Sequence, residues 1–268
     1  MDERLKGILA EKPRLIVEFP DWMFPPSLKE ELRSKELAIA EIAGRDSVAA
    51  CILAARQRPL EAILPTIAYT GTEFGSWDLP RQGVELLRQR LKVEGVRVYE
   101  PVFLGDPEFW RTLCGGALGS LTGRYGFITP CLGCHLYLHA IRVPLALMLG
   151  CRRVISGERE RHDHRVKLNQ VAPALDAYKE FLARRGLELL MPLREVASGE
   201  EVEAILGTPW PEGKGQMGCV LSGNYLDEGG DPLPWEEGRI RAFFREFAFP
   251  KAEEALRGYL RAVKGFGG

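Results

Sequence analysis

The sequence lacks the segments that mark export and membrane insertion. Its first residues, MDERLK, are mostly charged and contain no apolar core of the kind that a signal peptide needs. No uninterrupted apolar run reaches the roughly 18 residues that suggest a membrane-spanning helix. We therefore expect a cytoplasmic protein, in which the six cysteines are thiols or metal ligands and not structural disulfides.

The chain also has no excess of charge of either sign. Its 36 Lys and Arg residues balance 37 Asp and Glu residues, so the overall charge does not indicate nucleic-acid binding, although a local basic patch is compatible with this balance. There is no internal repeat and no low-complexity linker. Apolar residues make up 46% of the 268 residues, which is ordinary for a globular protein that can bury a substantial core.

What the chain does contain is an alternation of apolar strands and helical patterns. Strands are expected at residues 37–42, 62–69, 96–99, 153–156 and 187–191. Helices are expected at residues 48–55, 79–93, 136–149 and 199–206. This alternation predicts a Rossmann-like α/β fold, in which helices cover both faces of a parallel sheet.

Three parts are expected along the chain. Residues 1–35 are poorly patterned and are expected to form an N-terminal extension packed on the main fold. Residues 36–235 form the main α/β domain, in which the Gly- and Pro-rich segment 208–234 is mostly loop. Residues 236–268 form a helical C-terminal segment, interrupted at Pro250. The glycine-rich stretch 115–120 is interpreted as a lid, a plain connection or a phosphate-binding loop.

The most informative stretch is a turn in which an apolar strand passes through AGRDS directly into a helix. Such a turn brings backbone N–H groups and the positive end of a helix to one point, which suits a phosphate. Gly44 permits close approach of the backbone, and Asp46 and Ser47 can cap the helix or hold a ligand. The alternative is a capped turn in an ordinary α/β fold.

The string CLGCH, which contains Cys131 and Cys134, is the sharpest signal after that turn. Two thiolates at this spacing can reach one metal centre. The string also fits c-type haem attachment, which belongs outside the cytoplasm, and a thioredoxin-like redox pair, which normally lies early in its fold. Cys219, in a glycine-rich late loop, is a candidate third ligand. Three thiolates suit a 4Fe–4S cluster with one open iron, whereas zinc would want a fourth ligand such as His135.

The remaining cysteines do not point to a ligand role. Cys51 and Cys151 are expected to be buried small hydrophobes, and Cys114 is ambiguous. For the candidate ligands Cys131, Cys134 and Cys219, simple free thiols stay an alternative to a metal or a cluster.

All four histidines fall between residues 135 and 164. His135 and His139 share a face if this segment is helical, which is compatible with metal binding and equally with a half-buried helix. The charged segment 156–167 is interpreted as a solvated loop or as a clamp for polyphosphate or a nucleic-acid backbone. The side chains that would form the clamp are Arg159, Arg161, Arg165 and Lys167.

These motifs resemble those of the PP-loop ATP pyrophosphatase superfamily and occur in the same order. The turn of that superfamily reads Ser-Gly-Gly-X-Asp-Ser, which Gly44, Asp46 and Ser47 match. Ile42 and Ala43 replace its leading Ser and Gly.

The later segments resemble two branches of the superfamily. YTGTEF at 69–74 and GER at 157–159 are similar to loops of the phosphoadenylyl-sulfate reductases, with Tyr69 in place of Asp. The central segment, from CLGC to LGCRRVISG at 149–157, looks like that of the cluster-dependent tRNA 2-thiolation enzymes. Their late Arg-Pro-Leu and Glu-Glu-Ile segment resembles MPL and the following EEV. His162 and Asp163 are similar to part of a Gly-His-X-X-Asp-Asp segment. The N-terminal zinc ribbon of some thiolases is missing.

The resemblance implies a HUP-type α/β fold and ATP-dependent sulfur transfer. A carbonyl of the acceptor, a tRNA base, would be adenylated, and sulfur from a donor would then displace AMP. ATP with Mg²⁺ would be bound by Ala43, Gly44, Arg45, Asp46, Ser47, Tyr69, Thr70, Gly71 and Gly157. Asp46 and Arg159 would be catalytic, with Arg159 stabilising charge on phosphate. Cys131, Cys134 and Cys219 would hold a 4Fe–4S cluster that binds incoming sulfide.

Several alternatives stay open. Cys134 or Cys219 could carry a persulfide without any cluster, and zinc or no metal could replace the cluster. The chain could instead be an ATP-dependent ligase or amidase acting on a small molecule, or a nucleotide-binding protein without turnover. No membrane partner is expected, and the oligomeric state is open, a homodimer being one option.

Overall fold

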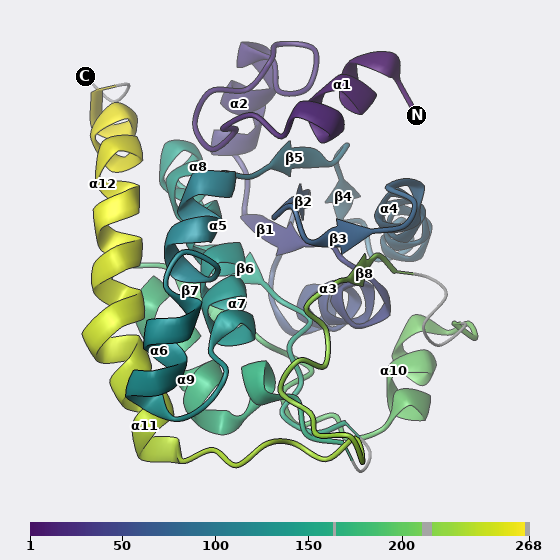
Figure 1. Cartoon of the computed structure of the whole chain (residues 1–268). Coiled ribbons are helices and arrows are strands. Elements are labelled where there is room, and N and C mark those ends of the chain that lie inside the picture. Colours follow the sequence, from purple (N-terminus) through teal and green to yellow (C-terminus); the bar gives the residue numbers. More distant parts are fainter. Residues whose placement is uncertain (163–164, 211–215, 266–268) are drawn as a thin grey trace.

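A six-stranded parallel sheet forms the centre of the computed structural model, which describes residues 1–162, 165–210 and 216–265 (Figure 1). Its strands are β1 (Leu37–Glu41), β2 (Ala62–Ala68), β4 (Arg97–Val98), β5 (Val102–Leu104), β6 (Arg153–Ile155) and β7 (Glu188–Leu190). The order is β4-β2-β1-β6-β7, and β5 also pairs with β2, beyond the short β4. The predicted α/β fold is therefore confirmed.

The strands are apolar because both faces of the sheet are buried. Successive side chains of a strand point to opposite faces, and β1 follows this rule. Leu37 and Ile39 pack into one hydrophobic core, whereas Ala38 and Ala40 pack into the other. All four are nearly or completely excluded from solvent, as expected for a parallel sheet covered on both sides.

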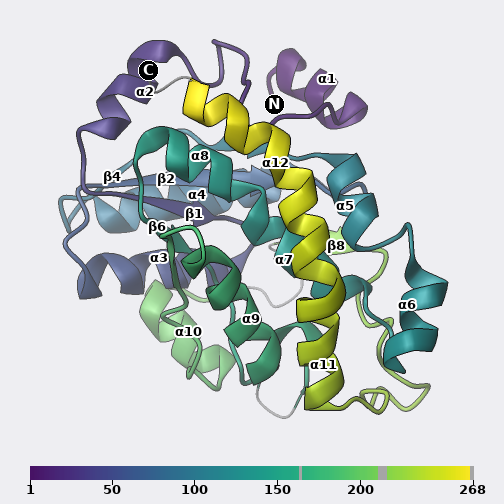
Figure 2. The ribbon, with the colours of Figure 1, turned by 90° about the vertical axis from the view of Figure 1, so that its left-hand side faces the viewer.

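Each face of the sheet has its own set of helices (Figures 1 and 2). One face is covered by α3 (Arg45–Gln57), α4 (Asp78–Leu91) and α10 (Gly199–Leu206). The other is covered by α7 (Pro130–Ala140), α8 (Arg142–Leu149), α9 (Ala172–Ala183), α11 (Glu237–Phe243) and α12 (Phe249–Gly265). The long α12 runs along the outside of this second layer, as Figure 2 shows.

The first 35 residues contain two helices that the sequence pattern did not predict. These are α1 (Glu3–Glu11) and α2 (Pro26–Arg33). Leu5 and Leu9 of α1 pack into the core on the α3 side of the sheet, and Leu32 of α2 packs into the core on the α8 side. The segment therefore contributes apolar side chains to both cores.

Several short elements between the main strands and helices were also not predicted. They are α5 (Pro107–Leu113), α6 (Leu118–Tyr125), the 3-10 turn Leu168–Gln170, and an antiparallel ribbon of β3 (Glu73–Phe74) and β8 (Gly218–Cys219). The glycine-rich stretch 115–120 is not entirely a loop, because its last three residues begin α6. Gly115 and Gly116 form the connection from α5.

The helix expected at residues 136–149 is divided into two helices, α7 and α8, and α7 begins six residues earlier than expected. α7 starts at Pro130, whose missing N–H is tolerated in the first turn of a helix. Pro144 cannot donate a hydrogen bond to the carbonyl of Ala140, and the helix breaks at Ile141. Cys131 and Cys134 consequently lie in the first turns of a helix and not in a turn before one.

The helical C-terminal segment is interrupted just before Pro250, the residue at which the sequence predicted an interruption. A π-helical turn, Phe244–Ala248, separates α11 from α12, and Pro250 lies in the first turn of α12. Pro250 lacks the N–H that would reach the carbonyl of Glu246, so the wider turn precedes the proline.

The segment Pro130–Leu149 is long and apolar enough to cross a membrane by length and composition alone. In the folded chain 78% of its apolar 18-residue window is buried inside the protein. Its apolar character is thus explained by its place in the core, between α9 and the sheet.

Candidate functional site

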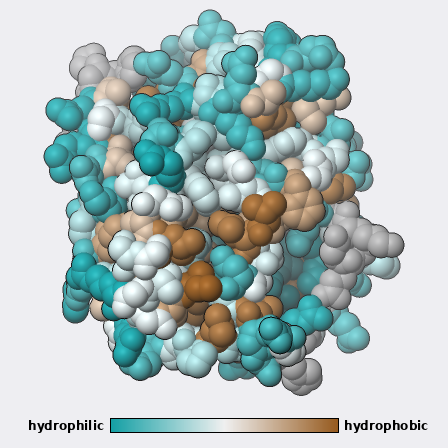
Figure 3. All heavy atoms as spheres, in the orientation of Figure 1, coloured by the Kyte–Doolittle hydropathy of each residue, from teal (hydrophilic) through white to brown (hydrophobic). Residues whose placement is uncertain are grey.

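A cavity of about 590 Å³ opens at the carboxyl ends of β1, β2 and β6. Glu41 ends β1, Ala68 ends β2, and Ser156 follows β6, and all three line the cavity. Ligands of open parallel α/β sheets bind at this edge of the sheet. The surface view shows apolar side chains gathered over β3 and β8 at the mouth, where Phe74 is 59% exposed and Val220 is 68% exposed (Figure 3).

One wall of the cavity is the turn at residues 42–47, which we call the phosphate turn. Helix α3 begins at Arg45, with Gly44 as its N-cap. The Ser47 hydroxyl accepts hydrogen bonds from the backbone N–H groups of Ala43 (3.0 Å) and Gly44 (3.1 Å) and donates to the Gly44 carbonyl (2.6 Å). The side chain of Ser47 thus satisfies two N–H groups that a phosphate would use.

Asp46 holds two guanidinium groups beside the phosphate turn. Its carboxylate accepts from Arg45 Nε at 3.0 Å and from Arg159 Nε at 2.9 Å. Arg159 is 3% exposed and lies behind the wall, whereas Lys167 lines the cavity. Burial lowers the pKa of Lys167, the positive charge of Arg159 adds to this, and Asp46 opposes it. The group is a concentration of positive charge next to a helix N-terminus.

Gly157 allows the loop after β6 to pack directly on the phosphate turn. A side-chain carbon at this position would lie 2.4 Å from the backbone nitrogen of Ser47. Only glycine fits this contact between two backbones. The Gly157 that the sequence singled out is therefore required by packing at the site itself.

The charged segment after Gly157 divides between buried and exposed side chains. Arg161 and Arg165 are exposed, so they do not belong to the wall of the cavity. His162 is buried, and burial, together with the charges of Lys167 and Arg159, lowers its pKa to about 4. Asp163 and His164 lie outside the described residues.

The loop after β2 forms the roof of the cavity. The Glu73 carboxylate accepts from the Thr70 N–H (3.0 Å), the Gly71 N–H (2.7 Å) and the Thr70 hydroxyl (2.8 Å). The Thr70 hydroxyl also bonds that of Thr72 at 2.8 Å. Tyr69 points away from the cavity, because its buried side chain donates to the carbonyl of Pro13.

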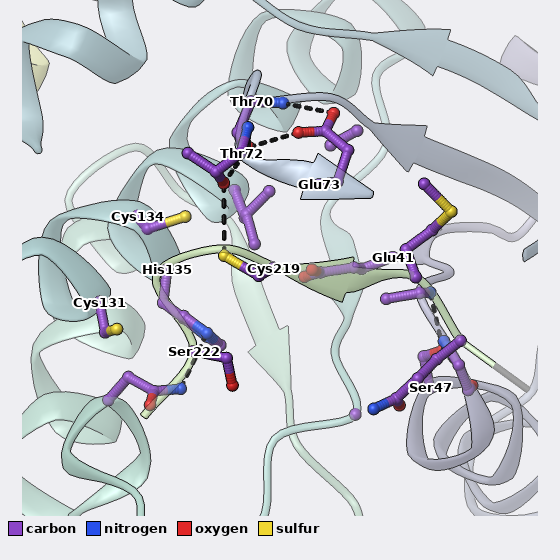
Figure 4. Close-up of a pocket in the computed structure, with 18 of the residues that line it drawn as sticks. Glu41, Ser47, Thr70, Thr72, Glu73, Cys131, Cys134, His135, Cys219 and Ser222 are labelled. Atoms are coloured by element: carbon purple, nitrogen blue, oxygen red, sulfur yellow. Dashed lines mark hydrogen bonds between the residues drawn. The ribbon is translucent and has the colours of Figure 1, made fainter. Parts of the chain in front are cut away.

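Cys131, Cys134 and Cys219, which we call the three cavity thiols, line the opposite wall (Figure 4). Cys131 donates to Asn224 Oδ1 at 3.5 Å, Cys134 accepts from Trp110 Nε1 at 3.3 Å, and Cys219 lies 3.4 Å from the Thr72 hydroxyl. Each sulfur thus has a different neighbour. Among the described residues, no group of three His, Cys, Asp or Glu side chains is placed closely enough to hold a metal ion.

Cys114, which the sequence left ambiguous, lies beside Cys134. Its buried thiol donates a hydrogen bond to the Cys134 sulfur. That bond lowers the pKa of Cys134 against the effect of burial, and the charge of His135 and the Trp110 N–H act in the same direction. Burial raises the pKa of Cys131 to about 12. Cys134 therefore has more thiolate character than Cys131.

Cys51 and Cys151 are buried away from the cavity wall, as predicted. Cys51 is completely buried within α3, and Cys151 is 5% exposed and donates to the Leu37 carbonyl at 3.2 Å.

A cluster of buried and half-buried ionisable side chains, which the sequence analysis missed, lies between the two walls. It consists of Glu41, His135, His139, Arg142 and Glu158, and we call it the buried charge cluster. Glu158 Oε1 lies 2.8 Å from His135 Nδ1 and 3.2 Å from His139 Nε2. Glu41 Oε2 lies 3.8 Å from His139 and 3.7 Å from Arg142. Two features of the sequence could have indicated this cluster. Glu41 is a charged residue at the end of an apolar strand, and Arg142 is a charged residue in an apolar helix.

The charges in this cluster stabilise one another. Burial alone would lower the pKa of His135, but the charge and hydrogen bond of Glu158 outweigh it and raise the pKa to about 9. Burial alone would raise the pKa of Glu158, but His135 and His139 lower it to about 2. Oε2 of Glu41, Oε2 of Glu158 and Nη2 of Arg142 are buried without a hydrogen-bond partner among the described residues. Such atoms at a cavity wall are available to a bound ligand.

The structure brings most of the predicted site residues to this one cavity. Those that line it are Ala43, Gly44, Asp46, Ser47, Thr70, Gly157, Cys131, Cys134 and Cys219. Arg45, Tyr69, Gly71 and Arg159 lie behind or beside the lining residues.

Comparison with known proteins gives one relative of high similarity. The uncharacterized protein MJ0009 of Methanocaldococcus jannaschii is 36% identical over 242 residues, which cover 87% of this chain and 87% of that protein. No family model matches the chain.

Two solved structures superpose only loosely. A predicted subunit of tRNA methyltransferase from Methanocaldococcus jannaschii gives a TM-score of 0.36 with 14% identity, over 64% of this chain and 73% of that one. The U34-tRNA thiolase NcsA from Methanococcus maripaludis, solved with its 4Fe–4S cluster, gives 0.38 with 15% identity, over 88% of this chain and 77% of that one. At these scores neither likeness carries an argument about function.

Proposed function

The chain belongs to the same family as the Methanocaldococcus jannaschii protein MJ0009, and we propose that it is an ATP-dependent sulfur-transfer enzyme of the PP-loop type. One observation carries the proposal. The phosphate turn and the three cavity thiols, which are far apart in the sequence, line the same cavity. An enzyme that adenylates the oxygen of an acceptor carbonyl and then delivers sulfur to the carbon of the same carbonyl needs both in one place.

ATP with Mg²⁺ would bind with its phosphates at the phosphate turn. Rotation of the Ser47 hydroxyl would free the N–H groups of Ala43 and Gly44 for phosphate oxygens. Arg45 and Arg159, oriented by Asp46, would stabilise the charge that develops when the acceptor carbonyl oxygen attacks the α-phosphorus and pyrophosphate leaves. The remaining residues of the proposed nucleotide site are Thr70, Gly71, Gly157 and the backbone of Tyr69.

The three cavity thiols would hold a 4Fe–4S cluster. The chemistry of the donor set suits a cluster, because three soft thiols from α7 and β8 line one cavity, but each must turn from its present hydrogen-bond partner before the three can bind one metal centre. When bound, the cluster would supply an iron that carries the incoming sulfide. The acceptor would be a tRNA base or a small molecule with a comparable carbonyl.

A second candidate is sulfur transfer through a persulfide on Cys134 without a cluster. The lowered pKa of Cys134 favours it, since the thiolate is the nucleophilic form of cysteine. Iron and sulfide analysis of anaerobically purified protein separates the two. Stoichiometric iron with a brown colour supports the cluster. Colourless, iron-free protein whose Cys134 takes the outer sulfur of a donor persulfide and releases the donor thiol supports the second candidate.

ATP binding tests the part that both candidates share. Titration calorimetry of the wild type and of Asp46→Ala should show an ATP affinity at least about tenfold lower in the variant, since Arg45 and Arg159 lose their common partner. Asp78→Ala is a matched control. Asp78 also lies in the first turn of a helix and pairs with an arginine, but on the α4 surface. Equal affinities for Asp46→Ala and wild type, or no ATP binding at all, would contradict the proposed site.

Release of products tests turnover. With a suitable acceptor and sulfur donor, the enzyme should release pyrophosphate and AMP in equal amounts. Binding of ATP without pyrophosphate release for any acceptor tried would favour a nucleotide-binding protein without turnover.

A further inference from the structure

The end of α5 lies directly against α7 at Gly133, the residue before Cys134. A side-chain carbon at Gly133 would lie 2.3 Å from the Leu113 carbonyl oxygen and 3.4 Å from the Cys114 sulfur. The two backbones can come this close only because residue 133 is glycine. This contact places Cys114, the C-cap of α5, beside the first turns of α7.

The two thiols brought together in this way are neighbours but differ in access. Trp110, one helical turn before Cys114 at the end of α5, donates from Nε1 to the Cys134 sulfur at 3.3 Å, so this end of α5 lies against Cys134. Cys114 is completely buried in the hydrophobic core, whereas Cys134 lines the cavity. A reagent that enters the cavity therefore meets Cys134 first, with a second thiol already behind it.

We propose that Cys114 and Cys134 are a redox-active pair that forms a reversible disulfide. An oxidant of the disulfide class, such as oxidised glutathione, would react with Cys134 from the cavity to form a mixed disulfide and release one glutathione thiol. Cys114 would then attack the Cys134 sulfur, forming the internal S–S bond and expelling the second glutathione thiol. The two cysteines lose two electrons and two protons in total, which reduce the oxidant to two thiols.

Formation of this disulfide would give the site an oxidised state besides the reduced one. In the oxidised state Cys134 can neither bind a metal nor carry sulfur. This consequence rests on the proposed function, but formation of the disulfide does not. A metal bound at Cys134 would in turn protect the pair from oxidation.

Thiol mapping tests the pair directly. Reduced protein is incubated with oxidised glutathione, alkylated, digested and examined by mass spectrometry, with its iron and zinc content measured in parallel. The wild type should lose two alkylatable thiols and yield a peptide crosslinked through Cys114 and Cys134, and dithiothreitol should restore both thiols.

Two variants complete the test. Cys114→Ser should leave Cys134 as a stable glutathione adduct, whereas Cys51→Ser, which removes a buried thiol of α3, should form the same crosslink as the wild type. A stable glutathione adduct on Cys134 in the wild type, or a crosslink from Cys134 to Cys131, would overturn the proposal. Thiol counts involve neither ATP nor an acceptor, so failure here leaves the proposed sulfur transfer standing, and the reverse also holds.

Discussion

The two walls of the cavity are assembled in different ways. The phosphate turn is local, because Ser47 and Arg45 bond groups within four residues of themselves. The thiol wall is assembled from distant segments, since α5, α7, the loop after β2 and β8 each contribute a neighbour of a sulfur. Besides β1 and α3, the first wall is contacted by one further segment, the loop after β6, through Arg159 on Asp46 and Gly157 on Ser47. The second depends on the packing of the whole α7 side of the protein.

A substitution in the buried charge cluster should cause the largest loss of stability, because the cluster supports α7 and hence the thiol wall. Glu158→Gln leaves His135 and His139 without the carboxylate that they share, and breaking a buried pair costs about 3–5 kcal/mol. Urea denaturation measures the loss. Glu160→Gln is the matched control, since it lies in the same loop and pairs with Arg194 near the surface, where a loss below about 1 kcal/mol is expected. Equal losses in the two variants would contradict the role of the cluster.

The same variant should change how stability depends on pH. The folded pKa of His135 is raised to about 9, so its contribution is complete below pH 6.5 and is lost as the pH rises through 9. The folded pKa of Glu158 is lowered to about 2, so its contribution is complete above pH 4.5 and is lost as the pH falls through 2. We expect the wild type to lose stability between pH 6.5 and 9 and Glu158→Gln to lose less over that range. Parallel curves for the two proteins would argue against the pair.

Glycine substitutions compare rigid and adaptable contacts at the phosphate turn. Gly157→Ala places a carbon 2.4 Å from the backbone of Ser47 and should cost about 1–3 kcal/mol and weaken ATP binding. Gly44→Ala places a carbon 2.8 Å from Cβ and Oε1 of Gln216, so Gln216 must shift, but the nearest atoms belong to a side chain and not to a backbone, and the extended φ of −172° suits any residue. A loss smaller than that of Gly157→Ala is expected there. Thermal unfolding of both variants measures the difference, and the reverse order would show that the loop after β6 is free to shift.

Serine substitutions should have the smallest effect on stability while separating the cysteines into two classes. Changing any of the three cavity thiols should remove bound metal from anaerobically purified protein, because each would be a ligand. Cys51→Ser and Cys151→Ser should retain it. Metal analysis together with circular dichroism decides the matter, and retention of metal by Cys219→Ser would remove that residue from the proposed ligand set.

The sequence predicted the parts of this protein that are specified locally. The strands from β1 to β7, apart from the short β3 and β5, and helices α3, α4 and α10 follow from apolar periodicity and turn residues. Helices α1, α2, α5 and α6 were missed because they are short and depend on tertiary packing for their stability. The longer α9 was missed as well. The start of α7 was missed because Pro130 and Gly133 read as helix breakers, although one suits a first turn and the other a close helix contact.

The site was predicted in the same uneven way. Gly44, Asp46, Ser47 and Gly157 lie in short motifs, and the structure places all of them at the cavity. Glu158 was noted only as part of the charged segment after β6, and its role in the buried charge cluster, like the contact of Cys114 with Cys134, depends on contacts between residues more than 15 positions apart. Such contacts have no sequence pattern of their own.

The two-residue ribbon of β3 and β8 has a consequence for the order of events at the cavity. It pairs Glu73 with Cys219, and the same carboxylate of Glu73 fixes the roof loop through Thr70 and Gly71. A nucleotide that displaced the roof would therefore shift Cys219 with it, because Glu73 and Cys219 are paired directly through their backbones. In the proposed sulfur transfer, arrival of the nucleotide would thus be transmitted to one of the thiols that serve the sulfur, and the two halves of the reaction would be kept in sequence without a separate moving domain.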